Sequence, residues 1–249
     1  MTAPPTLLEI EQATLSAVPA PILAFDGPFV VRRFLGGTGR ANAACGLDPG
    51  PDPELPARIA RIEAFYASAG QVCRFRSTAL DPEGLAGLLQ ARGYTAHDES
   101  QVITGPLAGF ARSDPDARIL SGPEPDWMEV VATAEHQSEA RRAEKARMAE
   151  LLGVPAAWVL LMVDGQAAAS AFVTAQGRCA GLFDLAVRPE FRRRGLGQRV
   201  MAAAGAWAAG QGADWAYAQV SCANAASLAM NAGLGLREQY RYVYWLKRG

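Results

Sequence analysis

The residues best suited to binding an anion lie in the segment LFDLAVRPEFRRRGLGQR, residues 182–199. Its apolar first part predicts a buried strand, which Arg188-Pro189 ends because proline cannot continue a hydrogen-bonded ladder. Gly195-Leu196-Gly197 then opens an alanine-rich helix, whose first amides have no partner inside the helix. Together with the helix dipole and the arginines at 192–194 and 199, these amides would attract a pyrophosphate.

Two other interpretations of this segment are weaker. Arginine clusters at helix starts are usually solvated, and a bare G-x-G is common, but an apolar strand, a proline, R-x-x-G-x-G and an amphipathic helix in succession favour an anion site. The segment is not a Walker loop, because no G-K-[ST] follows. It is not a dinucleotide-binding loop either, because its glycine spacing differs from that fingerprint.

Residues 187–197 resemble the acyl-CoA signature of the GCN5-related N-acetyltransferases (GNAT). Arg192, Gly195 and Gly197 meet its core pattern, Q/R-x-x-G-x-G/A. The resemblance covers about residues 121–246, and the first half matches more weakly, without the R-x-x-G-x-G loop. It therefore implies a tandem arrangement with a degenerate N-terminal GNAT-like half.

The resemblance also implies how the chain would hold acetyl-CoA as a co-substrate. The backbone at 185–187 would pair with the pantetheine arm and polarise the acetyl carbonyl, and the amides at 193–198 would hold the pyrophosphate. An amine would then attack the thioester directly, so catalysis would depend on orientation and on stabilising an oxyanion. The cofactor-binding residues implied are Leu185, Ala186, Val187, Arg192, Arg193, Arg194, Gly195, Leu196, Gly197, Gln198 and Asn224.

The sequence departs from the family pattern at two catalytic positions. Where many members have a tyrosine that protonates the leaving thiolate, this chain has Asn231, and where some have a glutamate base it has Gln219. Neither role transfers to an amide. About 0.1% of a primary amine is neutral at pH 7, so a base would be useful.

Asp184 is the first candidate for that base. The run FDLAV resembles the YDLAV of aminoglycoside 3-N-acetyltransferases, where the aspartate faces the acceptor amine. The alternative is an aspartate that orders local backbone or pairs with an arginine. Glu135 and His136 are second candidates, with helix capping or a solvated face as their alternative.

A proton donor for the thiolate is sought on the last predicted strand. Tyr240, Tyr242 and Tyr244 alternate there and would share one face of the sheet. Tyr244 is the candidate acid, against aromatic packing or protonation by water.

Two further segments have open interpretations. Arg141, Arg142, Lys145 and Arg147 alternate with glutamates on a charged helix. This pattern indicates a solvated face, or else a patch for an acidic acceptor. Residues 37–42, GTGRAN, form either a plain turn or the lining of a cleft between two halves, and Arg40-Ala41-Asn42 resembles an Arg-x-Asn element of some tandem acetyltransferases.

The predicted elements repeat across the chain. The first half reads as a helix at 6–17, a hairpin at 21–34, then helix, strand, helix and strand, with the third helix starting after an Asp81 cap. The second half reads α-α-β-β-β-α-β-α-β, and a Pro/Gly-rich stretch at 105–125 separates the two. The sequence thus predicts an α+β (α/β) fold with a mixed, mostly antiparallel sheet flanked by helices. The expected domains are 1–110, a degenerate GNAT-like domain, and 111–249, the acetyl-CoA-binding catalytic domain.

Composition narrows the function classes. The 249 residues carry a net charge of −1, which gives no cationic field for nucleic acid or an acidic membrane. The N-terminus lacks the features of a secretory signal, and the longest apolar run, 154–163, is about half a membrane span. Four cysteines without a C-x-x-C pair indicate reduced thiols of a cytoplasmic protein, and two histidines make a metal site unexpected.

We therefore expect an acetyl-CoA-dependent N-acetyltransferase that acts on the primary amine of a small molecule. The alternatives are a protein N-terminal or lysine acetyltransferase and a non-catalytic acyl-CoA sensor. We expect a monomer or homodimer that binds neither nucleic acid nor membrane.

Overall fold

The computed structural model describes residues 2–134 and 137–247. Within these residues the helices are α1 (Leu7–Ala17), α2 (Leu55–Ala67), α3 (Leu85–Ala91), α4 (Pro125–Ala132), α5 (Glu139–Arg147), α6 (Leu196–Gly210) and α7 (Ala225–Gly233). The strands there are β1 (Ile22–Asp26), β2 (Phe29–Arg33), β3 (Ala44–Gly46), β4 (Arg74–Ser77), β5 (Thr95–Pro106), β6 (Ala117–Leu120), β7 (Ala156–Val163), β8 (Gln166–Gln176), β9 (Cys179–Val187), β10 (Trp215–Ser221) and β11 (Arg237–Leu246).

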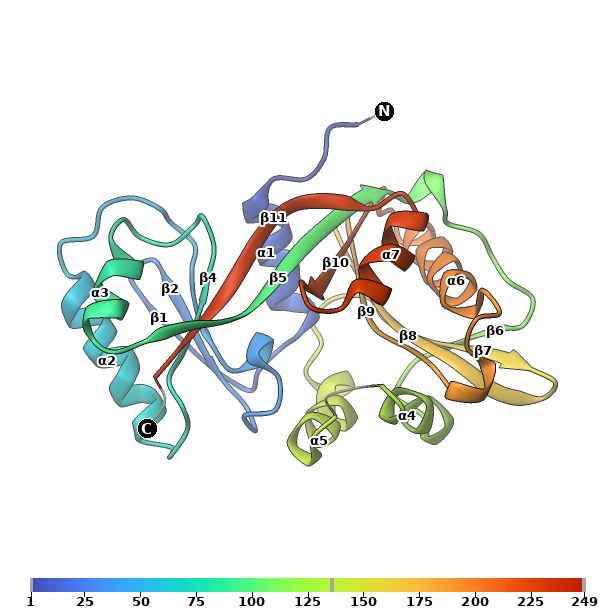
Figure 1. The fold of residues 1–249 in the computed structure, drawn as a ribbon, viewed down its shortest axis with the longest axis horizontal. Coiled ribbons are helices and arrows are strands. Elements are labelled where there is room, and N and C mark those ends of the chain that lie inside the picture. Colours follow the sequence, from blue (N-terminus) through green and yellow to red (C-terminus); the bar gives the residue numbers. More distant parts are fainter. Residues whose placement is uncertain (1, 135–136, 248–249) are drawn as a thin grey trace.

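One continuous sheet runs through the described residues, in the order β1-β2-β3-β4-β11-β5-β10-β9-β8-β7-β6 (Figure 1). Within it, the two halves repeat one pattern. β1, β2 and β3 are antiparallel neighbours and β3 pairs in parallel with β4, as β7, β8 and β9 are antiparallel and β9 pairs in parallel with β10. The crossover helices are α2 and α6, and a short helix then leads to the last strand of each half. The predicted mixed α+β fold with its internal repeat is confirmed.

The last strand of each half is hydrogen-bonded into the other half. β5 lies between β11 and β10, and β11 lies between β4 and β5, so that Tyr217 opposes Thr104 and Tyr244 opposes Arg76. Because the sheet is continuous across this exchange, the division into 1–110 and 111–249 stays a prediction.

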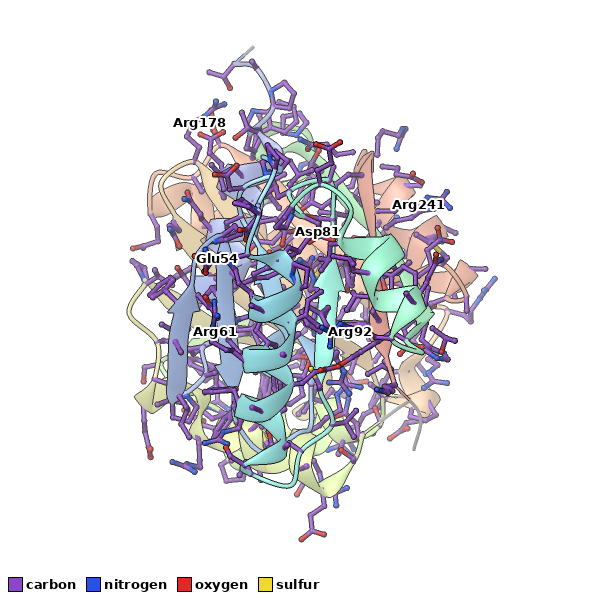
Figure 2. All side chains as sticks on the ribbon, turned by 90° about the vertical axis from the view of Figure 1, so that its left-hand side faces the viewer. Glu54, Arg61, Asp81, Arg92, Arg178 and Arg241 are labelled. Carbon is purple, nitrogen blue, oxygen red and sulfur yellow. The ribbon has the colours of Figure 1, made fainter. Side chains whose placement is uncertain are left out.

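Helices cover both faces of the sheet. In the C-terminal half, α6 packs on one face, and α4 and α1 pack on the other (Figure 1). In the N-terminal half, α2 and α3 bury apolar side chains against β2, β3 and β4; Figure 2 shows this side, with Glu54 and Arg61 labelled. Loops and α5 fill the junction of the halves.

Most predicted elements are confirmed, with differences at their ends. The helix predicted at 6–17 is α1, where Thr6 is the N-cap and forms a capping box with Glu9. The predicted Asp81 cap is wrong, because α3 begins after Gly84, and the Asp81 carboxylate instead accepts a hydrogen bond from the Ser77 hydroxyl. The short strands β3 and β6 were not predicted, since each has too few residues to show an alternating pattern.

The four cysteines are free thiols, of which Cys45 and Cys179 are buried. No helix in the described part of the chain is long and apolar enough to cross a bilayer.

Candidate functional site

The parallel strands β9 and β10 separate partway along their length. Residues 179–182 pair with 215–218, and the pairing does not extend to the remaining residues of either strand. On its other side, β9 carries a β-bulge against β8 at the position of Asp184, whose φ is 52°. A bulge places two successive side chains on one face, so Phe183 and Asp184 both face the side of α5. The strand backbone beyond the bulge borders the opening.

The loop that follows β9 presents a row of unpaired amides. The chain turns at Arg193 and Gly195, which have φ of 64° and 74°, and α6 starts directly after Gly195. Within the described residues, no hydrogen bond is donated by the backbone N–H groups of residues 193–197. Five consecutive free donors at a helix start are suited to binding an anion.

Gly197 keeps the space between this loop and the strand opening clear. A Cβ atom placed there would lie 3.8–3.9 Å from side-chain atoms of Met230, Leu185 and Val187. A larger side chain would therefore fill the groove between α6, α7 and β9. The residues present thus fit a long ligand with a diphosphate at the amides and a thin arm along β9.

The arginines of the loop have different partners. Arg192 donates from Nε to the carbonyl of Val187 (3.2 Å), and Arg194 lies over the Phe191 ring, 5.4 Å from its centroid. The exposed side chains of residues 192–194 make no ion pair with any described carboxylate. They remain available to a ligand.

Arg199 has a structural role instead. Its guanidinium pairs with both carboxylate oxygens of Asp114 (2.8 Å each) and with Asp116 (2.7 Å). The expectation that Arg199 adds charge to the anion site is wrong, because two aspartates from the linker before β6 already hold it.

The side-chain amides at the remaining family positions make hydrogen bonds within the chain. Asn224 caps α7, and its Oδ1 accepts from the N–H of Ser227 (3.0 Å), so its contact with a cofactor arm stays a prediction. Asn231 is buried and donates to the carbonyl of Ser227 (2.9 Å). Gln219 donates to Thr14 Oγ1 of α1 (2.8 Å). Within the described residues, Oδ1 of Asn231 and Oε1 of Gln219 lack hydrogen-bond partners.

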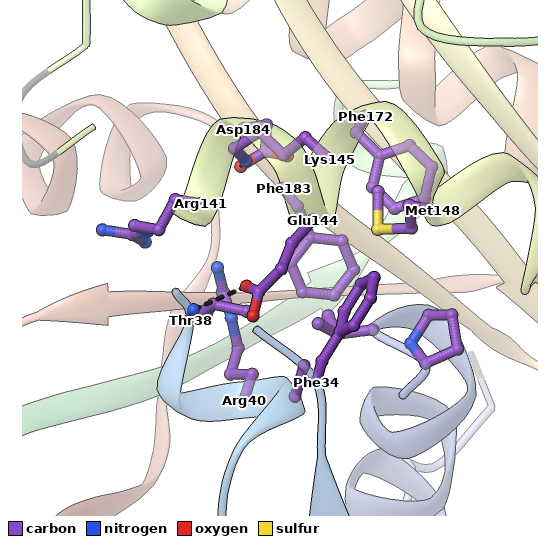
Figure 3. A pocket seen from close by; sticks show the side chains of 13 residues that line it. Phe34, Thr38, Arg40, Arg141, Glu144, Lys145, Met148, Phe172, Phe183 and Asp184 are labelled. Carbon is purple, nitrogen blue, oxygen red and sulfur yellow. Dashed lines mark hydrogen bonds and ion pairs between the residues drawn. The ribbon is translucent and has the colours of Figure 1, made fainter. Parts of the chain in front are cut away.

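A pocket lies on the opposite side of β9, between the two halves (Figure 3). Its empty space of about 460 Å³ includes space that is open to solvent. One end is apolar and the other is charged. The apolar lining comprises Val18, Pro19, Phe34, Ala41, Met148, Phe172 and Phe183, and the polar lining comprises Thr38, Arg40, Arg141, Glu144, Lys145 and Asp184.

Asp184 forms a buried ion pair with Lys145 in this pocket. Burial of the Asp184 carboxyl raises its pKa, but the charges of Lys145, Arg40 and Arg141 outweigh that effect and the pKa is lowered. Burial also lowers the pKa of Lys145, against the attraction of Asp184. Asp184 is thus ionised at neutral pH, and its role as a base stays a prediction.

Glu144 fastens α5 to the N-terminal half. Its carboxylate accepts hydrogen bonds from the N–H groups of Leu35 (3.1 Å), Gly37 (2.9 Å) and Thr38 (2.7 Å) and from the side-chain amide of Asn42 (2.8 Å). A Cβ atom on Gly37 would lie 2.6 Å from the backbone nitrogen of an α5 residue, so only glycine permits this approach. The glycine-rich turn lines the cleft, as one of its two interpretations expected.

Sequence reasoning missed Glu144 and Lys145, since the predicted solvated face of α5 is wrong at these two buried residues. Arg141, Lys145 and Met148 follow at helical spacing, and the apolar Met148 would have identified that face as buried.

The tyrosines of β11 share one side of the sheet. Tyr242 and Tyr244 belong to the same buried cluster, and Tyr240 packs against it and donates to Glu11. Tyr244 lies outside the pocket lining, against Gly39, and burial raises its pKa, which weakens it as an acid. Its role as proton donor stays a prediction. The candidates Glu135 and His136 lie outside the described residues.

The chain was compared with known proteins. Residues 6–245 match the family model described as "Probable histone acetyltransferase Rv0428c C-terminal". The chain is 24% identical over 246 residues to the "Uncharacterized N-acetyltransferase YobR" of Bacillus subtilis, covering 96% of this chain and 98% of that protein.

Two solved structures have a similar fold. A GCN5-related N-acetyltransferase from Kribbella flavida superposes with a TM-score of 0.71 at 19% identity, over 97% of this chain and 95% of that one. A tandem GNAT protein from the clavulanic acid biosynthesis pathway superposes with a TM-score of 0.65 at 15% identity, over 99% and 89% of the two chains. The expected tandem GNAT fold is therefore confirmed, and the chain belongs to the GCN5-related N-acetyltransferases, in the family described by the Rv0428c C-terminal region.

Proposed function

We propose that the protein transfers an acetyl group from acetyl-CoA to the primary amine of a small molecule. The observation that carries this proposal is the row of free amides at 193–197 beside the opening between β9 and β10, with a pocket on the far side. One site for a diphosphate and one for an acceptor thus meet at a single gap in the sheet.

The chain's own residues supply binding and orientation. The amides at 193–197 and the arginines at 192–194 hold the diphosphate, and the backbone of residues 185–187 aligns the pantetheine arm. When bound, acetyl-CoA supplies the activated acyl group as a thioester. A backbone N–H of β9 past the bulge at Asp184 stabilises the negative charge that develops on the carbonyl oxygen.

Asp184 orients the incoming amine. Its lowered pKa keeps it ionised, so it accepts hydrogen bonds from the acceptor nitrogen at neutral pH. The same lowered pKa makes it a weaker base than an unpaired carboxylate. We infer that positioning is its larger contribution to the rate.

The partly covered pocket favours a small acceptor. α5 and the glycine-rich turn cover it, and Glu144 fastens them together. A protein acceptor, which the family description suggests, needs an open groove for a peptide on both sides of the amine. A non-catalytic sensor is the other alternative, favoured by Asn231 and Gln219 at the usual acid and base positions.

The test measures release of the free CoA thiol from acetyl-CoA with a broad panel of small amines and peptides. We expect release with a small amine, and Asp184→Asn should lower kcat at pH 7 by roughly 10–100-fold while leaving acetyl-CoA affinity unchanged. Asp164→Asn is the matched control, because Asp164 has almost the same φ, 51°, in a distant hairpin turn. Binding of acetyl-CoA without thiol release in any reaction would support the sensor, and release only with peptides would support a protein acceptor.

A further inference from the structure

The charged end of the pocket between the halves brings cationic side chains and carboxylates together. Arg40, Arg141 and Lys145 line it, together with the carboxylates of Asp184 and Glu144. Glu144 is held by three backbone N–H groups and an amide, and Asp184 is paired with Lys145. Neither carboxylate is bonded to Arg40.

Arg40 is the cation that a ligand could use. Within the described residues its guanidinium makes no hydrogen bond or ion pair, and its contact is with the Phe183 ring, 5.3 Å from the centroid. Its side chain is half-buried and rises into the pocket from the glycine-rich turn, towards Asp184 (Figure 3). The turn itself is fixed, because Arg32 donates to the carbonyl of Arg40. The guanidinium is therefore presented by a rigid element.

The three cations also repel one another. Burial lowers the pKa of Arg141, and the charge of Arg40 lowers it further. Arg40 and Arg141 also contribute to the lowered pKa of Lys145, after its burial. A bound anion at this end would relieve the repulsion, and a carboxylate matches the planar guanidinium.

The other end of the pocket is apolar. Phe34, Met148 and Phe172 gather there, away from the cations (Figure 3). A ligand that fills the whole pocket thus needs a charged end and an apolar body. Asp184, which faces the acceptor nitrogen, lies at the charged end, so the amine and the anion of the acceptor must be close together.

We propose that the acceptor is an amino acid with an apolar side chain, whose carboxylate binds Arg40 and whose amino group lies at Asp184. This assignment rests on the proposed function and names its substrate class. The ammonium loses one proton to solvent, and its nitrogen forms the C–N bond with the thioester carbonyl carbon as the C–S bond breaks. The second proton passes to the thiolate, which gives the N-acetyl amino acid and CoA.

The test compares phenylalanine with phenethylamine, which lacks the carboxylate, and with phenylalaninamide, which has a neutral group in its place. We expect kcat/KM for phenylalanine to exceed that for either compound by at least about tenfold. Arg40→Ala should abolish the preference and Arg40→Lys should restore part of it. Arg142→Ala, an exposed arginine on α5, should leave it unchanged.

A binding measurement separates this inference from the proposed function. N-acetylphenylalanine and N-acetylphenethylamine are titrated into the protein with CoA present. If no amine is acetylated but N-acetylphenylalanine binds at least about tenfold more tightly to the native protein than to Arg40→Ala, the carboxylate site stands and the catalytic proposal fails. The inference would be overturned by equal affinity for the two acetylated compounds, by a higher kcat/KM for phenethylamine or phenylalaninamide than for phenylalanine, or by turnover confined to peptides.

Discussion

The two halves contain the same order of elements, but residues of opposite charge precede their crossover helices. In the C-terminal half, arginines and Gly195 precede α6, and its first amides have no acceptor in the described chain. In the N-terminal half, the segment 47–54 precedes α2 and contains the acidic residues Asp48, Asp52 and Glu54 instead of arginines. Carboxylates stabilise a helix N-terminus as a bound anion does.

The comparison shows how a repeated unit loses a ligand site while keeping its fold. In α2, Glu54 is the N-cap residue, and Pro56 removes one of the first amides. Arg58 pairs with Asp52 (2.6 Å) and Asp26 (2.5 Å), so the acidic loop is fixed to the first hairpin. The amides at this helix start already have acceptors, because those of Gly50 and Glu54 donate to the carboxylates of Asp48 and Asp52, and that of Leu55 donates to the carbonyl of Asp52.

The largest expected effect tests this comparison directly. Gly197→Phe should weaken acetyl-CoA binding by at least about 100-fold, because the ring fills the groove beside Leu185 and Val187. Gly50→Phe, in the corresponding loop of the N-terminal half, should leave affinity unchanged. Calorimetric titration of each variant measures this, and equal losses at both positions would show that the halves share the binding.

A smaller effect is expected at the contact between the halves. Glu144→Ala leaves the N–H groups of Leu35, Gly37 and Thr38 without their acceptor and should lower the free energy of unfolding by about 3 kcal/mol. It should also raise the KM for the acceptor amine, because α5 would no longer be held over the pocket. Glu150→Ala is the exposed control. An unchanged midpoint of chemical denaturation would show that Glu144 does not stabilise the contact between α5 and the turn.

The smallest effect separates two buried aspartates, one from each half. Burial raises the pKa of Asp81 to about 6, whereas that of Asp184 is lowered. A raised pKa gives stability that is present below about pH 4 and is lost as the pH rises through 6. Asp81→Asn should therefore gain up to about 2 kcal/mol over the native protein between pH 4 and 7. A stability difference that does not vary over this range would exclude such a shift.

The features that could be predicted from the sequence are those whose pattern lies within one short segment. The loop from Val187 to Gly197 was identified because its signal lies within a dozen positions. Asp184 was selected from the same segment. Its partner Lys145 was not, because nothing local in either segment specifies that a helix before β7 packs over β9.

Contacts between distant segments could not be predicted from the sequence for the same reason. The pairing of Glu144 with the turn at 35–38 depends on two elements that only the folded sheet brings together. The exchange of β5 and β11 was not anticipated either. Each strand alternates in the same way whichever neighbour it joins, so its pattern says nothing about which half it completes.

The exchanged strands also bear on how the chain is made. β4 gains its second neighbour only when β11 arrives, so the first half leaves the ribosome with an open sheet edge. That edge stays exposed through the synthesis of every element from β5 to α7. We therefore expect nascent chains that stop before Arg237 to aggregate or to recruit chaperones, and the two halves to become protease-resistant in a single step.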